Sequence, residues 1–257
     1  SLSTLDSNTN VGNSAGEGIF ANNSYRTIVG ASSITNNYIG IYINSGFNST
    51  IHNNTITNSY NYNIYAESSS YNALNGNTVS QAVGGTGLYL SNSIYNTLNS
   101  NSFNSHGSAG ASLSNSDNNT FINTITNSNN DIGVSLTNSD NNTFIKTTSN
   151  SNLQTGLSLS SSYLNYFNDT TLNSNMGSNG ASISASANNT FVIVRANGNG
   201  GAFSISNSRY INLTDADLTG SEGGGLSLVV NASNNFFFDL NMSLNGQTSS
   251  GDGLSIT

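Results

Sequence analysis

One short phrase, a small residue followed by apolar-x-apolar, recurs along the whole chain at nearly constant spacing. Its copies start at Gly18, Gly40, Asn63, Gly87, Gly110, Gly133, Gly156, Gly180, Ala202, Gly225 and Gly253. The steps between copies are 22 to 24 residues, apart from a last step of 28. A period of this size indicates a solenoid, in which each repeat is one supersecondary unit stacked on the next. Because apolar and polar residues alternate with a period of two, we expect strands rather than helices.

Two further apolar positions follow this phrase in most repeats. The stretch Ser-x-Asn-Asn-Thr-Phe occupies 116–121, 139–144 and 186–191, and a third apolar residue stands at Ile34, Ile56, Val79, Ile125, Leu172 and Leu218. Three short strands per repeat, separated by Asn, Ser and Gly corners, predict an all-β fold, a single-stranded parallel β-helix (β-solenoid) of about 11 coils of ~23 residues. We expect residues 18–257 to form this β-helix, and residues 1–17 to form an N-terminal segment that is a cap or an inter-subunit arm.

One Asn of the second phrase recurs in every middle repeat. Aligned by repeat, it forms a column of Asn72, Asn96, Asn119, Asn142, Asn165 and Asn189. An Asn at a corner tolerates left-handed backbone, and its amide can bond the amides of the coils above and below. We therefore predict that this column is a structural ladder and not a binding site.

The chain is polar without being charged. Only 6% of its 257 residues are charged, the net charge is −8, and the basic residues are Arg26, Lys146, Arg195 and Arg209. With so few cations, neither nucleic acid nor anionic lipid is an expected partner. No apolar run of about 18 residues is present, so no membrane span is expected. The absence of Cys excludes thiol chemistry and disulfides.

Sequons of the form Asn-x-Ser/Thr are spread through the chain. They stand at Asn22, Asn48, Asn53, Asn118, Asn141, Asn168, Asn188, Asn212, Asn231 and Asn241. Such sites carry glycans on exported proteins, although a chain rich in Asn, Ser and Thr also forms them by chance. The first residue is Ser, which fits a cleaved export product. We expect an exported, extracellular or cell-surface protein and leave its glycosylation open.

The two repeated phrases resemble the right-handed parallel β-helix repeats of NosD-like and pectate-lyase-like proteins. The resemblance covers the chain from Gly18 to Ile256 and implies a right-handed β-helix. This broad group includes polysaccharide lyases and hydrolases, phage tailspikes, adhesins and prokaryotic surface proteins. The resemblance therefore specifies a fold and leaves the activity open.

Catalysis on a polysaccharide would need converging charged groups, and the sequence offers few. Hydrolases need two or three carboxylates on one face, and the best pair on one strand is Asp215 and Asp217. Repeat alignment places Arg195 beside Asp217, and Lys146 beside Asp169. We interpret these neighbours as cross-strand ion pairs.

The chain has two histidines, His52 and His106, and neither stands in a recognisable catalytic or metal-binding motif. Polygalacturonases, which belong to the broad β-helix group that this chain resembles, carry Gly-His-Gly and Arg-x-Lys. His106-Gly107 is a poor match to the first motif, and no Arg-x-Lys is present. His52 and His106 lack a Cys or carboxylate cluster at metal spacing. We predict no catalytic residue, no metal centre and no cofactor.

Asp117 and Asp140 are expected in the same column of adjacent coils, about 5 Å apart. Two like charges at that separation repel each other, and a structural divalent cation or an Arg of a partner would relieve the repulsion. The alternative is a well-solvated corner where the two side chains splay apart. Both interpretations stay open at this stage.

Aromatic residues are concentrated in the N-terminal third. The outward position of the repeated phrase holds Phe20, Tyr42, Tyr65 and Tyr89, and then Ser in the later repeats; a nearby corner column holds Phe47, Tyr71 and Tyr95. Aromatic residues on neighbouring strands stabilise each other by stacking. On a surface otherwise made of Ser and Asn, such a patch also suggests a contact with a protein or with a sugar ring.

These observations favour a structural protein over an enzyme. We expect a non-enzymatic subunit of an extracellular filament, sheath or surface layer, a homopolymer that assembles head-to-tail through open β-helix ends and the aromatic columns. The alternative is a carbohydrate-binding or carbohydrate-cleaving β-helix that contacts surface glycans. Ice binding through the outward column of Thr97, Thr120, Thr143 and Thr190 is disfavoured, because Tyr166 interrupts that column.

Overall fold

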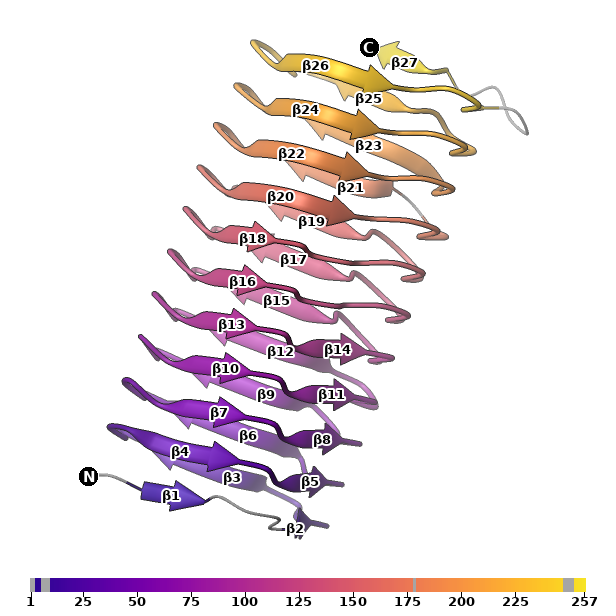
Figure 1. The fold of residues 1–257 in the computed structure, drawn as a ribbon. Coiled ribbons are helices and arrows are strands. Elements are labelled where there is room, and N and C mark those ends of the chain that lie inside the picture. The colour runs from indigo at the N-terminus through magenta and orange to yellow at the C-terminus, as the bar shows by residue number, and fades with distance from the viewer. Residues whose placement is uncertain (1–2, 6–9, 178, 247–251) are drawn as a thin grey trace.

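The computed structural model describes residues 3–5, 10–177, 179–246 and 252–257 and forms one parallel β-helix (Figure 1). Each coil runs through strands that pair only with strands of the preceding and following coils, about one repeat away in sequence. Within the described residues all regular structure is β-strand. The all-β β-solenoid with a repeat of about 23 residues is therefore confirmed.

Sheet 1 contains one strand from each coil along the whole rod. In spatial order it comprises β1 (Ser3–Leu5), β4 (Thr27–Gly30), β7 (Thr50–His52), β10 (Ala73–Asn75), β13 (Thr97–Asn99), β16 (Thr120–Ile122), β18 (Thr143–Ile145), β20 (Tyr166–Thr171), β22 (Thr190–Arg195), β24 (Asn212–Asp217) and β26 (Phe236–Asn241).

Sheet 3 faces it across the core and carries the repeated phrase. It comprises β3 (Glu17–Asn22), β6 (Ile39–Asn44), β9 (Tyr62–Glu67), β12 (Thr86–Ser91), β15 (Ala111–Ser114), β17 (Val134–Thr137), β19 (Leu157–Ser160), β21 (Asn179–Ser184), β23 (Gly201–Ser206), β25 (Leu226–Val229) and β27 (Leu254–Ile256).

Sheet 2 is shorter and covers only the N-terminal coils. It comprises β2 (Asn10–Gly12), β5 (Ser33–Thr35), β8 (Thr55–Thr57), β11 (Thr78–Ser80) and β14 (Ser102–Asn104). Isolated bridges continue its line through Ile125, Thr148 and Thr171. In the C-terminal coils, the strands of sheet 1 are six residues long, and their last residues occupy the position that sheet 2 has in the N-terminal coils.

Part of the segment 1–17 belongs to the sheets themselves. β1 pairs with β4 and β2 pairs with β5, both in parallel register. The described residues 3–5 and 10–12 therefore extend sheets 1 and 2 by one strand each. A role of this segment as a cap or an inter-subunit arm stays a prediction.

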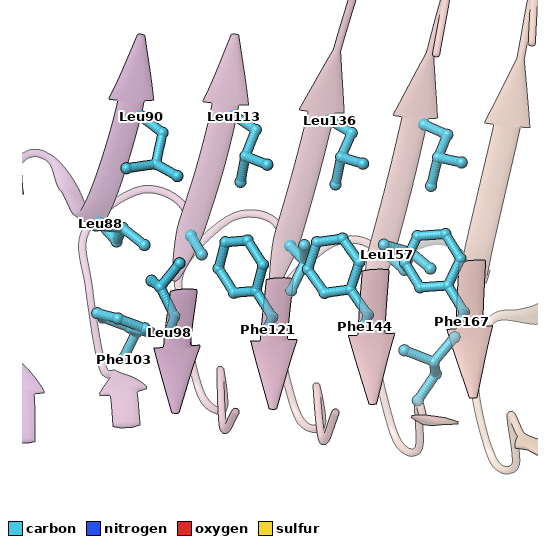
Figure 2. Close-up of a cluster of buried hydrophobic side chains, with 14 of the residues drawn as sticks. Leu88, Leu90, Leu98, Phe103, Leu113, Phe121, Leu136, Phe144, Leu157 and Phe167 are labelled. Atoms are coloured by element: carbon cyan, nitrogen blue, oxygen red, sulfur yellow. The ribbon is translucent and has the colours of Figure 1, made fainter. Parts of the chain in front are cut away.

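Inward side chains stack in columns along the rod axis. The clearest column is Phe121, Phe144, Phe167 and Phe191, whose successive ring centroids are 4.5, 4.9 and 4.8 Å apart. Figure 2 shows three of these rings on consecutive strands of sheet 1, opposite the leucines of sheet 3. Gly recurs at the start of the phrase because the coils approach closely there: a Cβ on Gly133 would lie 2.7 Å from the Gly156 carbonyl oxygen.

The predicted Asn column is buried at corner 1, the bend between sheet 3 and sheet 1. Asn142 is representative: its N–H and its Nδ2 both donate to Asn165 Oδ1, at 2.8 and 3.2 Å, and its Nδ2 also donates to the Ser116 carbonyl at 3.0 Å. Each Asn thus forms hydrogen bonds with backbone groups of the neighbouring coils. Such groups would destabilise the fold if they were buried without a partner.

The left-handed residue at corner 1 is not the ladder Asn, contrary to our expectation. It is the residue before it, such as Asn118 (φ 58°) and Asn141 (φ 56°). This left-handed step turns the chain inward, so the following Asn points into the core instead of out from the corner. Tyr71 (φ 58°) and Leu164 (φ 58°) occupy the same strained position in other coils.

Three more buried polar ladders accompany this one and were not singled out from the sequence. A Ser ladder at corner 1 runs through Ser69, Ser93, Ser116, Ser139, Ser162, Ser186 and Ser208, and two further Asn ladders run through Asn54, Asn77 and Asn101 and through Asn129, Asn152, Asn175 and Asn199. The members of each ladder recur at the repeat spacing, so the sequence contained the signal. It was hard to recognise because Asn and Ser are also common at other positions of the repeat.

Candidate functional site

The aromatic side chains on the outer face of sheet 3 stack on one another. Phe20, Tyr42, Tyr65 and Tyr89 stack face to face, with successive centroids 5.0, 4.7 and 5.4 Å apart. The inner rings, Tyr42 and Tyr65, are therefore covered on both faces by their neighbours. A sugar ring stacks on an open aromatic face, and the inner members of this column offer none.

A carboxylate is tied into the same column. Tyr42 Oη donates a short hydrogen bond to Glu67 Oε2. Burial, followed by the hydrogen bond and the charge of Glu67, raises the pKa of Tyr42 to about 12. Burial and the Glu67 charge raise the pKa of Tyr65 as well. These phenols therefore stay protonated and act as hydrogen-bond donors at any physiological pH.

The second aromatic group lies at corner 1 and occupies two neighbouring columns. Phe47 pairs in register with Tyr25 and Ser70, whereas Tyr71 follows one residue later. The rings still touch: Phe47 and Tyr71 are 5.1 Å apart, and Tyr71 and Tyr95 are 5.0 Å apart. Each of these side chains is about half exposed, so this corner presents an apolar edge to the solvent.

Asp117 and Asp140 lie in one column, and each bonds the coil above it. The Asp140 N–H donates to Asp117 Oδ1 and the Tyr163 N–H donates to Asp140 Oδ1, both at 2.7 Å. Burial and the charge of Asp117 raise the pKa of Asp140 above its usual value, while the Tyr163 N–H opposes the shift. Among the described residues no group of three His, Cys, Asp or Glu is placed to hold a metal ion.

His106 is a structural member of the third Asn ladder. It is buried, accepts the Ala82 N–H at Nδ1 over 3.0 Å, and donates its backbone N–H to Asn129 Oδ1. Burial lowers the pKa of His106 to about 4. The imidazole is therefore neutral at physiological pH and takes the place that Asn holds in later coils.

Most sequon asparagines stand at corners and face the solvent. Asn22, Asn48, Asn53, Asn141, Asn188, Asn231 and Asn241 are exposed, whereas Asn118, Asn168 and Asn212 are partly buried. The exposed group is sterically open to a glycan. Asn168 and Asn212 lie on the outer face of sheet 1, and Asn168 directly precedes Asp169.

Charged side chains gather on the C-terminal coils, at corner 2, the bend within the long strands of sheet 1. Arg195 Nη1 lies 3.1 Å from Asp169 Oδ1. Our expectation that Arg195 pairs with Asp217 is therefore wrong, although the two residues are in register as predicted. Asp217 instead accepts hydrogen bonds from the amides of Asn197 and Asn241, both at 3.1 Å.

Left-handed backbone explains why so many carboxylates meet here. Corner 2 needs a positive φ in each coil, and Asp169, Asp215 and Asp239 adopt 56°, 51° and 53°. Asp tolerates this conformation better than most residues. Ile193 adopts it as well, at 54°, which is strained for a β-branched side chain. Ile193, Asp215 and Asp239 line a surface depression of about 330 Å³, the charged depression, together with Arg195, Asp217 and Asn241.

A second depression lies on the same coils, at corner 1. Its volume is about 380 Å³, and Tyr163, Ala187 and Arg209 line it from three consecutive coils. Because Ala187 is small and lies between two long side chains, the column has a gap one coil wide. We call this gap the corner slot.

The outer face of sheet 1 joins the two depressions. Along β22 and β24 it presents small or polar side chains, namely Thr190, Val192, Asn212 and Thr214, which we call the strip. Larger aromatic residues border the strip: Tyr166 on the preceding strand, and Phe236 and Phe238 on the following one, all exposed. A six-residue strand is roughly 20 Å long, so the corner slot and the charged depression are separated by about that distance.

Comparisons with known proteins agree with this architecture. A family model described as a right-handed beta helix region matches residues 3–121 and 80–241. No curated protein sequence matches the chain. Within the described residues, no helix is long and apolar enough to cross a membrane.

Solved structures of similar fold include proteins that act on polysaccharides. The mannuronan C-5 epimerase AlgE4 A-module of Azotobacter vinelandii is 11% identical, with a TM-score of 0.67 over 100% of this chain and 88% of that one. The periplasmic alginate epimerase AlgG is 14% identical, with a TM-score of 0.65 over 93% of this chain and 61% of that one. The enzymatically active domain of bacteriophage CBA120 tailspike protein 2 is 14% identical, with a TM-score of 0.62 over 82% of this chain and 38% of that one. At such identities the likeness is one of fold.

Proposed function

Since the chain belongs to the right-handed β-helix family, we propose that it is a carbohydrate-binding β-helix, with its ligand lying across sheet 1 over the strip. The observation that carries the proposal is the pairing of two depressions at opposite ends of that strip, on the coils of β22, β24 and β26. An extended chain of sugars matches a long, shallow surface of this kind better than a compact ligand does.

The chemistry of the charged depression suits sugar hydroxyls. Ionised carboxylates accept hydrogen bonds from neighbouring hydroxyls at both oxygens, and amides both donate and accept. Asp215 and Asp239 are exposed and adjacent along corner 2, with Asn241 beside them. Several acceptors in one place favour a neutral sugar there, because an anionic unit would be repelled.

The aromatic borders supply apolar contact. Phe236 is 57% and Phe238 63% exposed. Unlike the stacked column of sheet 3, the Tyr166 ring stands next to the small Thr190 on the following strand. An open ring face next to a small residue is a surface on which a pyranose can pack.

The proposal assigns binding and no bond cleavage. Asp169 is committed to Arg195, and Asp217 to two amides. The fold likeness to alginate epimerases and a tailspike domain supports a carbohydrate ligand by analogy only. Exposed sequons support an exported protein, and the extracellular location remains part of this proposal.

A blocking substitution tests the site. Thr190→Trp would place a large side chain on the strip, whereas Thr120→Trp introduces the same change at the same column of sheet 1, away from the depressions. Binding is measured by affinity electrophoresis in gels with neutral polysaccharides and by a glycan array. We expect retardation of the wild type and of Thr120→Trp, and its loss in Thr190→Trp. Equal behaviour of the two variants would refute the assignment to this face.

The aromatic edge at corner 1 favours a second candidate function, the subunit of an extracellular filament, sheath or surface layer. Tyr71 and Tyr95 are 51% and 45% exposed, and they form a continuous apolar edge with Phe47. Contiguous apolar surface of this kind is typical of protein contacts. Electron microscopy and sedimentation of the wild type and of Tyr71→Ser test this: fibres that the substitution abolishes would support it, and a monomer at high concentration would eliminate it.

A further inference from the structure

The corner slot has the dimensions of a single ring. Tyr163, Ala187 and Arg209 are consecutive members of one column, so the Tyr163 and Arg209 backbones are two coils apart, roughly 9.6 Å. Stacked groups need about 3.5–4.0 Å on each side. The Ala187 side chain between them is a single Cβ and is only 5% exposed. The backbone spacing therefore leaves room for one ring between the phenol and the guanidinium.

Arg209 is uncommitted, in contrast to two other arginines. Arg195 is paired with Asp169, and Arg26 lies 5.1 Å from the centre of the Tyr25 ring. In the part of the chain that the structure describes, no ion pair, side-chain hydrogen bond or ring contact holds the Arg209 guanidinium. Its five N–H donors are therefore available to a ligand.

Charge is distributed unevenly between the two ends of the strip. The nearest carboxylate of the corner-slot column, Asp140, is three coils from Arg209, roughly 14 Å, and it bonds the Tyr163 N–H. Asp215 and Asp239 lie at the far end, in the charged depression. A negative group is therefore attracted at the corner slot and repelled at the opposite end.

We propose that the corner slot binds one pyranose unit that carries a carboxylate, with its ring on Tyr163 and its carboxylate on Arg209. This inference rests on the proposed carbohydrate binding and deepens it. The rest of the sugar chain crosses the strip as neutral units toward the charged depression. The arrangement selects chains with a single acidic unit at one end and also fixes their direction.

A matched pair of oligosaccharides tests the inference. Both have the same length and linkage, and one carries a terminal uronate where the other carries the neutral sugar. Dissociation constants are measured by titration calorimetry for the wild type, Arg209→Gln and the charge-matched control Arg26→Gln. We expect the wild type and the control to prefer the uronate probe by about tenfold at low salt. Arg209→Gln should bind both probes equally, with its affinity for the neutral probe unchanged.

A second variant addresses the ring instead of the charge. Ala187→Leu fills the gap between Tyr163 and Arg209, and we expect it to abolish the preference while Arg209 is intact. Circular dichroism confirms that each variant is folded. Equal binding of the two probes by the wild type, or a preference that survives Arg209→Gln, overturns the inference and leaves carbohydrate binding standing. Binding of neither probe overturns the proposed function and the inference with it.

Discussion

The N-terminal and C-terminal coils share one stacked architecture but present different side chains to the solvent. In the N-terminal coils, aromatic residues occupy the same outward position in consecutive coils, and Tyr42, Tyr65 and Tyr89 stack on one another. In the C-terminal coils, Tyr163 and Tyr166 are each followed by a small residue on the next coil, Ala187 or Thr190. The spacing of aromatic residues along a column therefore decides whether a ring stabilises the rod or is open to a ligand.

The backbone differs between the two regions as well. Sheet 2 is separate in the N-terminal coils, whereas β20, β22, β24 and β26 are six residues long and bend at corner 2. That bend needs left-handed residues, which are Asp169, Asp215 and Asp239 in three of these coils. The N-terminal coils make the same left-handed step at residues such as Asn53 and Ser100. The use of Asp at this step in the C-terminal coils therefore concentrates carboxylates on one face.

The largest expected effect tests the shared interior at His106, between the two regions. Because its pKa is lowered from 6.5 to about 4 in the folded protein, its stabilising contribution is complete above pH 6.5 and is lost as the pH falls toward 4. The loss reaches about 3 kcal/mol near pH 4. Thermal unfolding from pH 8 to pH 4 should reveal this slope. His106→Asn should remove it, because the amide can join the ladder through Asn129 without titrating.

Breaking the Asn ladder should cost nearly as much. Asn142→Leu leaves the Asn119 N–H and the Ser116 carbonyl without partners and should lower the free energy of unfolding by about 1–3 kcal/mol. Ser158→Ala on the outward face should cost less than about 0.5 kcal/mol. Chemical denaturation compares the two. Equal losses would contradict our assignment of the inside and the outside of the rod.

Substituting one tyrosine in each region tests the comparison directly. Tyr65→Ser removes two stacking contacts, with Tyr42 and Tyr89, and should cost about 1–2 kcal/mol of stability. Tyr163→Ser removes an open ring and should change the free energy of unfolding by less than about 0.5 kcal/mol while weakening carbohydrate binding. A large stability loss from Tyr163→Ser would show that its ring already has structural partners.

The smallest expected effect concerns the strain at corner 2. Ile193→Asn places a residue that tolerates left-handed backbone at φ 54° and should raise the stability by about 1 kcal/mol. Asp215→Asn occupies the same position in the next coil, where the native residue already tolerates that conformation, so no gain is expected. Denaturant titration measures the free energy of unfolding of both variants. A gain in Ile193→Asn alone indicates relief of backbone strain, whereas an equal gain in both would indicate an effect of the Asn side chain itself.

The sequence predicted best those features that recur in every coil. The phrase beginning at Gly133 and the column through Asn142 predict strand positions and ladder register because identical environments recur at each coil. Corner geometry was harder to predict: a left-handed residue at Asn141 instead of Asn142 differs by one position, and only backbone hydrogen bonding distinguishes the two. The corner slot was missed altogether, since Ala187 stands out only beside Tyr163 and Arg209, which are far from it in sequence.

The amino-acid sequence by itself determined the all-β solenoid, its repeat and the register that places Arg195 beside Asp217, because these follow from periodic burial of apolar residues. Only the tertiary structure decided which charges pair, which aromatic faces stay open and where the surface is hollowed. Those features depend on the direction and length of side chains from neighbouring coils. Arg195 therefore reaches Asp169 instead of its register partner, and Ala187 becomes the floor of a slot instead of one more small residue in a polar chain.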